Sequence, residues 1–148
     1  MVIPEVPLNP LHAVQKTALR NVISEWSQVS GITFIEVEES ETTVGDIRLG
    51  LSSEVQSLVG DATGFAYLPG NFYPSSGDIW FNSNANDLFG GFVTSTFENS
   101  EFKPGSLAYY TALHEFGHAL GLKHPFETLP EAKSVLSSNL DEISNTIM

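Results

Sequence analysis

The sequence predicts an α+β domain in which two helices pack against a sheet. Three observations support this fold class. Apolar residues recur at helical spacing between residues 10 and 30, and short segments rich in β-branched and aromatic residues follow up to residue 82. A second helical pattern begins after Ser106, which is expected to be its N-cap. At 148 residues, the chain has about the length of one domain and can bury a core.

The first helix is expected to begin at Asn9-Pro10, because asparagine is a good N-cap and proline is tolerated at the first helical position. Gly31 is expected to end it. His12 falls in the first turn, far along the chain from the other histidines, and we interpret it as a surface residue. The apolar stripe that should pack on the sheet consists of Leu11, Val14, Ala18, Leu19, Val22, Ile23, Trp26 and Val29.

Four segments are predicted to be strands, and the second of them alternates polar and apolar residues, which indicates one buried face. These segments are residues 32–38, 46–51, 63–68 and 78–82. Residues 52–61 have no clear periodicity and are interpreted as a loop. Residues 82–105 are polar and glycine-rich, which predicts a long loop of a kind that is often functional or mobile.

The stretch from His114 to His124 reads H-E-x-x-H-x-x-G-x-x-H and contains three of the four histidines. On a helix, His114 and His118 lie one turn apart on the same face and can bind one metal ion. Glu115 lies about 100° around the helix, close to that ion but outside its ligand set. A continuous helix would place His124 roughly 9 Å beyond His118, too far for a bond of about 2.0–2.1 Å. We therefore expect Gly121 to take a left-handed conformation that turns the chain back.

This motif predicts a catalytic zinc site, because three neutral imidazoles leave one coordination position open. A lone histidine is usually an ordinary polar residue, but the added glycine and third histidine argue against coincidence. Pro125 prevents the helix from resuming. The helix should lie between the sheet and a cleft, since an apolar stripe occupies the side opposite the histidines: Tyr109, Ala112, Leu113, Phe116 and Leu120.

Composition excludes several classes of function. The net charge of −12 repels phosphate backbones, so we expect no nucleic-acid partner. Acidity could also help to hold Ca²⁺, but no D-x-[DN]-x-[DN]-G loop supports a calcium site. No apolar run approaches the ~20 residues of a membrane span, and the N-terminus lacks a signal-peptide pattern. The absence of cysteine excludes disulfides and cysteine-ligated zinc.

The zinc motif resembles that of the metzincin metallopeptidases, most closely the serralysin and matrixin branches. The blocks G-D-I-R-L-G, A-Y-L-P-G and G-D-I-W-F-N precede it in the order typical of these branches. The resemblance spans roughly residues 13–148 and implies a zincin-like architecture. This is a twisted, mixed, mostly parallel sheet with an antiparallel edge strand, backed by two helices, with the zinc helix beneath the active-site cleft.

In that family, the strand corresponding to residues 63–68 is the edge strand above the metal. The resemblance therefore implies that polypeptide substrates bind in extended conformation along Gly64, Phe65, Ala66 and Tyr67. Matrixins hold a second, structural zinc with histidines from the third and fourth strands. Phe65 and Trp80 stand at the matching positions here, which favours the serralysin branch and a single catalytic Zn²⁺.

Residues 144–148 resemble the start of the Met-turn, in which a methionine, here Met148, packs beneath the zinc ligands. The family pattern continues beyond that methionine, so residues 1–148 are interpreted as a single catalytic domain truncated at the Met-turn. The resemblance also implies an extracellular location.

The implied activity is that of a zinc metalloendopeptidase. Zinc held by His114, His118 and His124 would lower the pKa of a bound water toward ~7, and Glu115 would take its proton and pass it to the leaving amine. Two alternatives stay open. The first is a zinc-binding module of the same fold without turnover, either a fragment impaired by truncation or a recognition module, and the second is a zinc hydrolase acting on a non-peptide amide. The sequence does not identify the substrate and leaves open a protein inhibitor as a partner.

Overall fold

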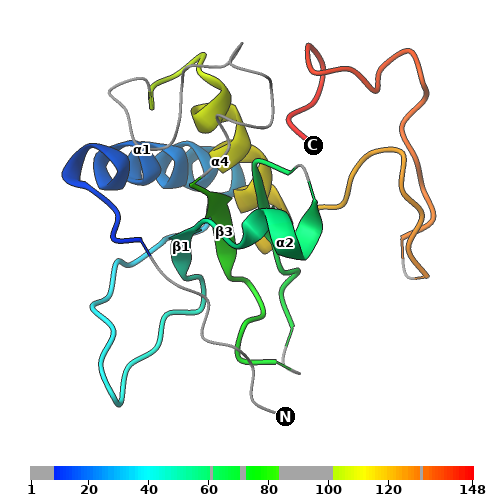
Figure 1. Ribbon diagram of the computed structural model, residues 1–148. Helices are drawn as coiled ribbons and strands as arrows, with labels where there is room; N and C mark the ends of the chain where they lie inside the picture. The colour runs from blue at the N-terminus through cyan, green and yellow to red at the C-terminus, as the bar shows by residue number, and fades with distance from the viewer. Residues whose placement is uncertain (1–8, 61, 71–72, 84–101, 131) are drawn as a thin grey trace.

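The computed structural model describes residues 9–60, 62–70, 73–83, 102–130 and 132–148. In chain order, the helices and strands are α1 (Ala13–Ser30), β1 (Leu49–Ser52), α2 (Val55–Val59), β2 (Gly64–Ala66), β3 (Ile79–Asn82) and α4 (Leu107–Ala119). Figure 1 shows α1 and α4 packed together, with the sheet beside α4. This arrangement confirms the predicted α+β class. None of the helices in the described ranges is long and apolar enough to cross a membrane.

The sheet has the strand order β1-β3-β2. Strands β1 and β3 are parallel, with Leu49 opposite Ile79, whereas β2 runs antiparallel to β3, with Gly64 opposite Phe81. The predicted mixed sheet with an antiparallel edge strand is thus confirmed. Among the described strands, parallel and antiparallel pairing are equally represented, so the sheet is less dominated by parallel pairing than expected.

One continuous apolar core joins the sheet to both long helices. Its buried members include Ala18, Leu19 and Val22 from α1, Leu51, Ile79 and Phe81 from the strands, and Ala108, Tyr109, Ala112, Phe116 and Ala119 from α4. Two side-chain hydrogen bonds also join the helices: Trp26 Nε1 donates to the Leu113 carbonyl at 3.0 Å, and the Tyr109 hydroxyl donates to Glu25 at 2.6 Å. Helix α1 therefore fixes the position of α4, the zinc-motif helix, through contacts on the side of α4 that faces the core.

The first helix begins three residues later than predicted, and its N-cap is His12 rather than Asn9. The backbone N–H of Asn9 donates to the Leu51 carbonyl at 2.8 Å, which holds the chain extended beside β1. The His12 N–H donates to Gln15 Oε1 at 2.6 Å, so it is satisfied at the helix start. His12 itself is exposed, as predicted, and Gly31 ends the helix with φ +74°.

The predicted strand at residues 32–38 is wrong, because this segment does not pair with any described strand. Most of its side chains face solvent, and Ile35 is 81% exposed. Phe34 packs edge-on against Phe116, with ring centroids 6.0 Å apart, and Glu36 forms a bidentate ion pair with Arg20 of α1. Side-chain contacts thus hold the segment where a strand ladder was expected.

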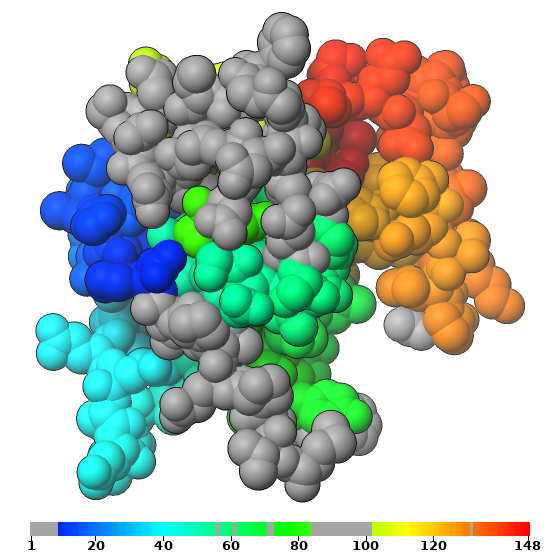
Figure 2. Space-filling view, in the orientation of Figure 1, coloured from blue at the N-terminus to red at the C-terminus, as the bar shows by residue number. Residues whose placement is uncertain are grey.

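Two further predictions concern the long connections. Residues 52–61, interpreted as a loop, contain the short helix α2, and Val55 of that helix is fully buried. The long loop predicted for residues 82–105 lies largely outside the described residues. The segment after α4 runs along one side of the molecule, coloured orange to red in Figures 1 and 2, and its end returns to α4.

Candidate metal centre

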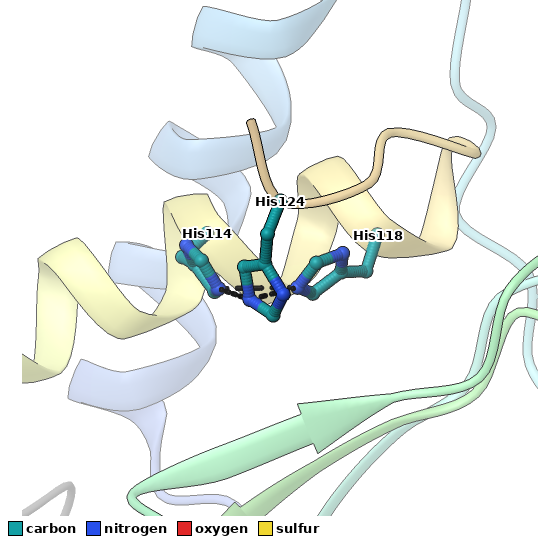
Figure 3. Close-up of side chains that lie close together, drawn as sticks. All are labelled: His114, His118 and His124. Atoms are coloured by element: carbon teal, nitrogen blue, oxygen red, sulfur yellow. Dashed lines mark hydrogen bonds between the residues drawn. The ribbon is translucent and has the colours of Figure 1, made fainter. Parts of the chain in front are cut away.

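Helix α4 positions the first two histidines. Ser106 caps its N-terminus by accepting a hydrogen bond from the Tyr109 N–H at 3.2 Å, as its sequence position predicted. The apolar side of the helix is buried in the core, which turns His114 and His118 toward the opposite side (Figure 3). Both residues are partly buried and line a cleft.

The third histidine is brought back by a tight turn at the end of α4. Gly121 has φ +96°; its N–H donates to the His118 carbonyl at 2.9 Å, and the Leu122 N–H donates to the Gly117 carbonyl at 2.9 Å. These two bonds form a Schellman motif, which closes a helix through a left-handed residue. The chain reverses there, and His124 lies beside the two helical histidines (Figure 3).

The three imidazoles direct their Nε2 atoms at one point. The Nε2 separations are 3.1 Å between His114 and His118 and 3.2 Å from each of these to His124. A tetrahedral ion with bonds of about 2.0–2.1 Å requires ligand atoms roughly 3.3 Å apart. The observed triangle therefore fits a Zn²⁺ ion. Within the described part of the chain, these histidines are the one group of three or more metal-ligating side chains.

Backbone carbonyls set the tautomers of the two helical histidines. His114 Nδ1 lies 2.7 Å from the Ile147 carbonyl, and His118 Nδ1 lies 2.8 Å from the Leu122 carbonyl. A carbonyl can only accept, so each Nδ1 carries the proton and each Nε2 presents a lone pair to the centre. Burial is the main cause that lowers the pKa of both imidazoles, which favours the neutral form that a metal binds.

His124 is held by its two near neighbours in sequence. Its ring stacks on Phe126, with centroids 5.1 Å apart and an angle of 4° between the planes. Its Nδ1 lies 2.9 Å from Glu127 Oε1, although the alignment there is poor for a hydrogen bond. Interaction with His124 lowers the pKa of Glu127, so the carboxylate is charged and can attract an Nδ1 proton. Both contacts orient the His124 ring, and the stack is the better defined.

Glu115 lies on the side of α4 that faces the edge strand. It is only 6% exposed, and burial raises its pKa to about 7. A Cβ added at Gly64 of β2 would lie 3.3 Å from Glu115 Cγ and 3.2 Å from Thr111 Cγ2. Strand and helix therefore approach closely beside this carboxyl group.

A cavity of about 570 Å³ contains the site. The edge strand lines it with Gly64, Phe65 and Ala66, but Tyr67 is not among its lining residues. Tyr67 instead contacts Phe65 edge-on, with ring centroids 5.4 Å apart. The cavity walls from α4 and from the segment after it comprise Leu107, Tyr110, Thr111, His114, Glu115, His118, Lys123, His124, Glu127 and Leu129. The structure thus brings the three histidines, Glu115 and most of the predicted edge strand into one cleft.

Met148 packs against α4 at Gly117, which lies between His114 and His118 in the sequence. Its sulfur packs where Gly117 has no side chain, and a Cβ at Gly117 would collide with Met148 Sδ and lie 3.2 Å from Trp26 Cζ2. The preceding residue, Ile147, supplies the carbonyl that holds His114. The end of the chain therefore contacts the site through both its backbone and its methionine side chain.

Several contributors to the site were missed by sequence reasoning. The carbonyls of Ile147 and Leu122 act through the backbone, which gives no pattern in the side chains. The hydroxyls of Thr63 and Thr111, 3.0 Å apart, join residues far apart in sequence. Only Phe126 could have been noticed, as an aromatic residue two positions after His124.

Comparisons with known proteins identify the family of this chain. A family model described as Matrixin (Peptidase M10) matches residues 7–140. Serralysin C of Dickeya chrysanthemi is 33% identical over 107 residues, covering 71% of this chain and 19% of that protein. Serralysin of Photorhabdus luminescens is 32% identical over 111 residues (75% and 20%), and human matrix metalloproteinase-25 is 31% identical over 105 residues (67% and 17%).

The chain spans about a fifth of the length of these relatives. The match to the family model covers the strands, α4 and all three histidines of the cluster, and it excludes only the ends of the chain. This protein therefore belongs to the matrixin family of metallopeptidases.

Proposed function

We propose that this chain is the catalytic domain of a zinc-dependent endopeptidase, with zinc held by His114, His118 and His124. One observation carries the proposal: three converging Nε2 atoms share a cleft with a buried carboxyl group, Glu115. A structural zinc site would close its fourth position with protein, whereas a cleft gives access to water and substrate.

Bound Zn²⁺ would act as a Lewis acid that lowers the pKa of water toward ~7 and polarises the scissile carbonyl. Glu115 accepts a proton from the attacking water and delivers it to the leaving amine. Burial raises its pKa to about 7, and a nearby cation would favour its charged form again, so the carboxylate can act as a base near neutral pH. Tyr110 packs on the His114 ring, with centroids 6.1 Å apart, and helps to keep that imidazole in place.

The open edge of β2 supports a polypeptide as the substrate. Thr63 accepts a backbone bond from Asn82 at 2.9 Å, and Tyr67 donates one to Asp78 at 2.9 Å. Hydrogen bonding alternates in antiparallel pairs, so Gly64 and Ala66 direct their backbone groups to the opposite edge, where no strand of the described ranges pairs with β2. An extended peptide can pair there by strand addition, which would place its main chain along the cleft. Tyr67 would then contribute mainly through its backbone and its contact with Phe65.

Family membership supports this assignment at the level of peptidase chemistry. The similar proteins are named serralysins and a matrix metalloproteinase, and the term metalloproteinase supports polypeptide substrates for this chain. The extracellular site of action that the resemblance implies is part of the same proposal. The cleft would accept a protein inhibitor through the same strand edge.

The test measures zinc content and hydrolysis of unstructured protein substrates such as casein, with and without a chelator. We expect about one zinc per chain, and activity that the chelator removes and added zinc restores. Glu115→Gln should keep the zinc and lose at least about a hundredfold in kcat, whereas His118→Ala should lose the zinc. Glu38→Gln is the matched control, because Glu38 is exposed on the segment before β1.

Two results would contradict the proposal. Full activity of zinc-loaded Glu115→Gln would remove Glu115 from the role of base. A zinc-loaded wild-type protein that binds peptides but cleaves none would favour the recognition module.

A further inference from the structure

The start of the edge strand is joined to the zinc-motif helix by a pair of threonines. The Thr63 and Thr111 hydroxyl oxygens lie 3.0 Å apart, within hydrogen-bonding distance. Thr111 is 3% exposed and lies one turn before Glu115 on the same face of α4, whereas Thr63 directly precedes β2. The bond therefore connects the segment that would pair with substrate to the helix that carries the ligands.

Close packing at Gly64 and Pro69 supports the same connection. A Cβ at Gly64 would lie 3.2 Å from Thr111 Cγ2, so the strand backbone rests directly on the helix there. Three residues after β2 ends, the Pro69 ring lies 3.4 Å from the position of a Cβ at Gly121, the residue that turns His124 back. The edge strand and the segment that follows it thus both pack on the elements that carry the histidines.

We propose that the hydrogen bond between the Thr63 and Thr111 hydroxyls positions β2, the substrate-binding edge strand, by setting its distance from Glu115 and the three histidines. The inference rests on the proposed function and extends it to two residues with no role in the zinc motif. Strand β2 has only three residues and, among the described strands, pairs only with β3, so backbone hydrogen bonds alone leave its position weakly determined. The hydroxyl bond, made next to the reacting groups, supplies the missing constraint.

The expected consequence is a loss of turnover rather than of metal. Thr→Val keeps the size of the side chain and removes the hydroxyl, so β2 can shift relative to Glu115. Misplacement by 1 Å can cost on the order of 10²-fold in rate, and a shift of a fraction of that should cost about tenfold. A substrate bound along the edge would still pair with the strand, so kcat should fall more than KM rises.

The experiment compares Thr63→Val, Thr111→Val, the double variant, Thr63→Ser and Thr111→Ser in zinc-loaded protein. We expect each valine variant to keep wild-type zinc content and to lose about tenfold in kcat. The double variant should be no slower than the single ones, because both substitutions remove one bond. The serine variants should recover most of the rate, since they keep the hydroxyl.

Amide hydrogen exchange of residues 64–66 in the same proteins gives a readout independent of turnover. We expect faster exchange in the valine variants and near wild-type exchange in the serine variants. Unchanged exchange, unchanged kcat, additive losses in the double variant, or losses that serine does not rescue would overturn the inference. A wild-type protein that cleaves no peptide would instead contradict the proposed function, and the exchange data would still decide whether the threonine pair holds the strand.

Discussion

Replacing Gly64 with alanine adds one methyl group between the edge strand and the zinc-motif helix. That methyl would lie 3.0 Å from the Trp80 carbonyl oxygen, 3.2 Å from Thr111 Cγ2 and 3.3 Å from Glu115 Cγ. Gly64 is not among the glycines with positive φ, so alanine meets no backbone strain there. Any effect must therefore come from the three close contacts.

These contacts fix the expected size of the effect. Carbon atoms pack best at about 3.5–4.0 Å, so β2 must move by about 0.3–0.5 Å to relieve all three contacts. None of the three neighbours can yield easily, because the oxygen belongs to the backbone of β3 and both Thr111 and Glu115 are buried. Overpacking of this kind typically costs 1–3 kcal/mol, and we expect about 2 kcal/mol. Moving the edge strand away from Glu115 should lower kcat by about tenfold.

Urea unfolding of the metal-free protein and peptide hydrolysis by the zinc-loaded protein measure these two effects. Gly70→Ala is the matched control, because a Cβ there would have only Ser76 Oγ nearby, at 3.6 Å, and its φ is also not positive. We expect the control to stay within about 0.5 kcal/mol of wild type and to keep its activity. If Gly64→Ala is as stable and as active as Gly70→Ala, the close approach of strand and helix does not position the site.

Three other predictions concern the metal centre. Phe126→Ala removes the ring stacked on His124 and should weaken zinc affinity by about tenfold in a competition titration with a chromophoric chelator, whereas unchanged affinity would exclude this role. Gly121→Val should destabilise the protein by about 2 kcal/mol in urea unfolding and weaken zinc binding, because φ is +96° there; a neutral result would mean that the turn adjusts. In metal-free protein, burial raises the pKa of Glu115 from 4.5 to about 7, so its contribution to stability is fully present below pH 4.5 and lost as the pH rises to 7. Wild type should therefore lose about 3 kcal/mol relative to Glu115→Gln across that window in urea titrations, and a difference that stays constant with pH would contradict the shift.

Local patterns predicted the parts of the fold that local interactions determine. The zinc-motif helix begins at the predicted cap because Ser106 satisfies an N–H of the first turn. Its apolar stripe packs in or against the core as periodicity predicted, with Leu113 and Leu120 only partly buried, and β2 and β3 form where β-branched and aromatic residues cluster. The histidine spacing, together with one glycine, was sufficient to expect a converging cluster.

Predictions failed where a distant partner decided the outcome. Asn9 is a good N-cap by type, but its N–H is bonded to Leu51, forty-two positions further along the chain, so the helix begins later. Residues 32–38 have the composition of a strand, yet Phe34 packs on α4 and Glu36 pairs with α1. The composition of a segment indicates which secondary structures it can form, whereas the residues that it contacts in the fold determine which of them it adopts.

The supporting contacts of the site could not be predicted for a similar reason. The carbonyl that orients His114 belongs to the backbone of Ile147. Any residue type with the same backbone conformation would serve equally well there. The Thr63–Thr111 bond is visible only once strand and helix are known to touch. Ligands are specified by residue type, but the groups that orient them are specified by the fold.

Without a cation, the metal centre is locally unfavourable, and the rest of the fold must offset its free-energy cost. The three Nε2 atoms lie within 3.2 Å of one another, so their lone pairs repel wherever no proton or cation lies between them, and Glu115 is buried where a charged carboxylate is disfavoured. The core behind α4 and the carbonyl of Ile147 keep these groups together despite that repulsion. A bound cation would remove both penalties at once, because it accepts the lone pairs and favours the carboxylate. Zinc should therefore stabilise the folded state by mass action, and more strongly as the pH rises from 4.5 to 7.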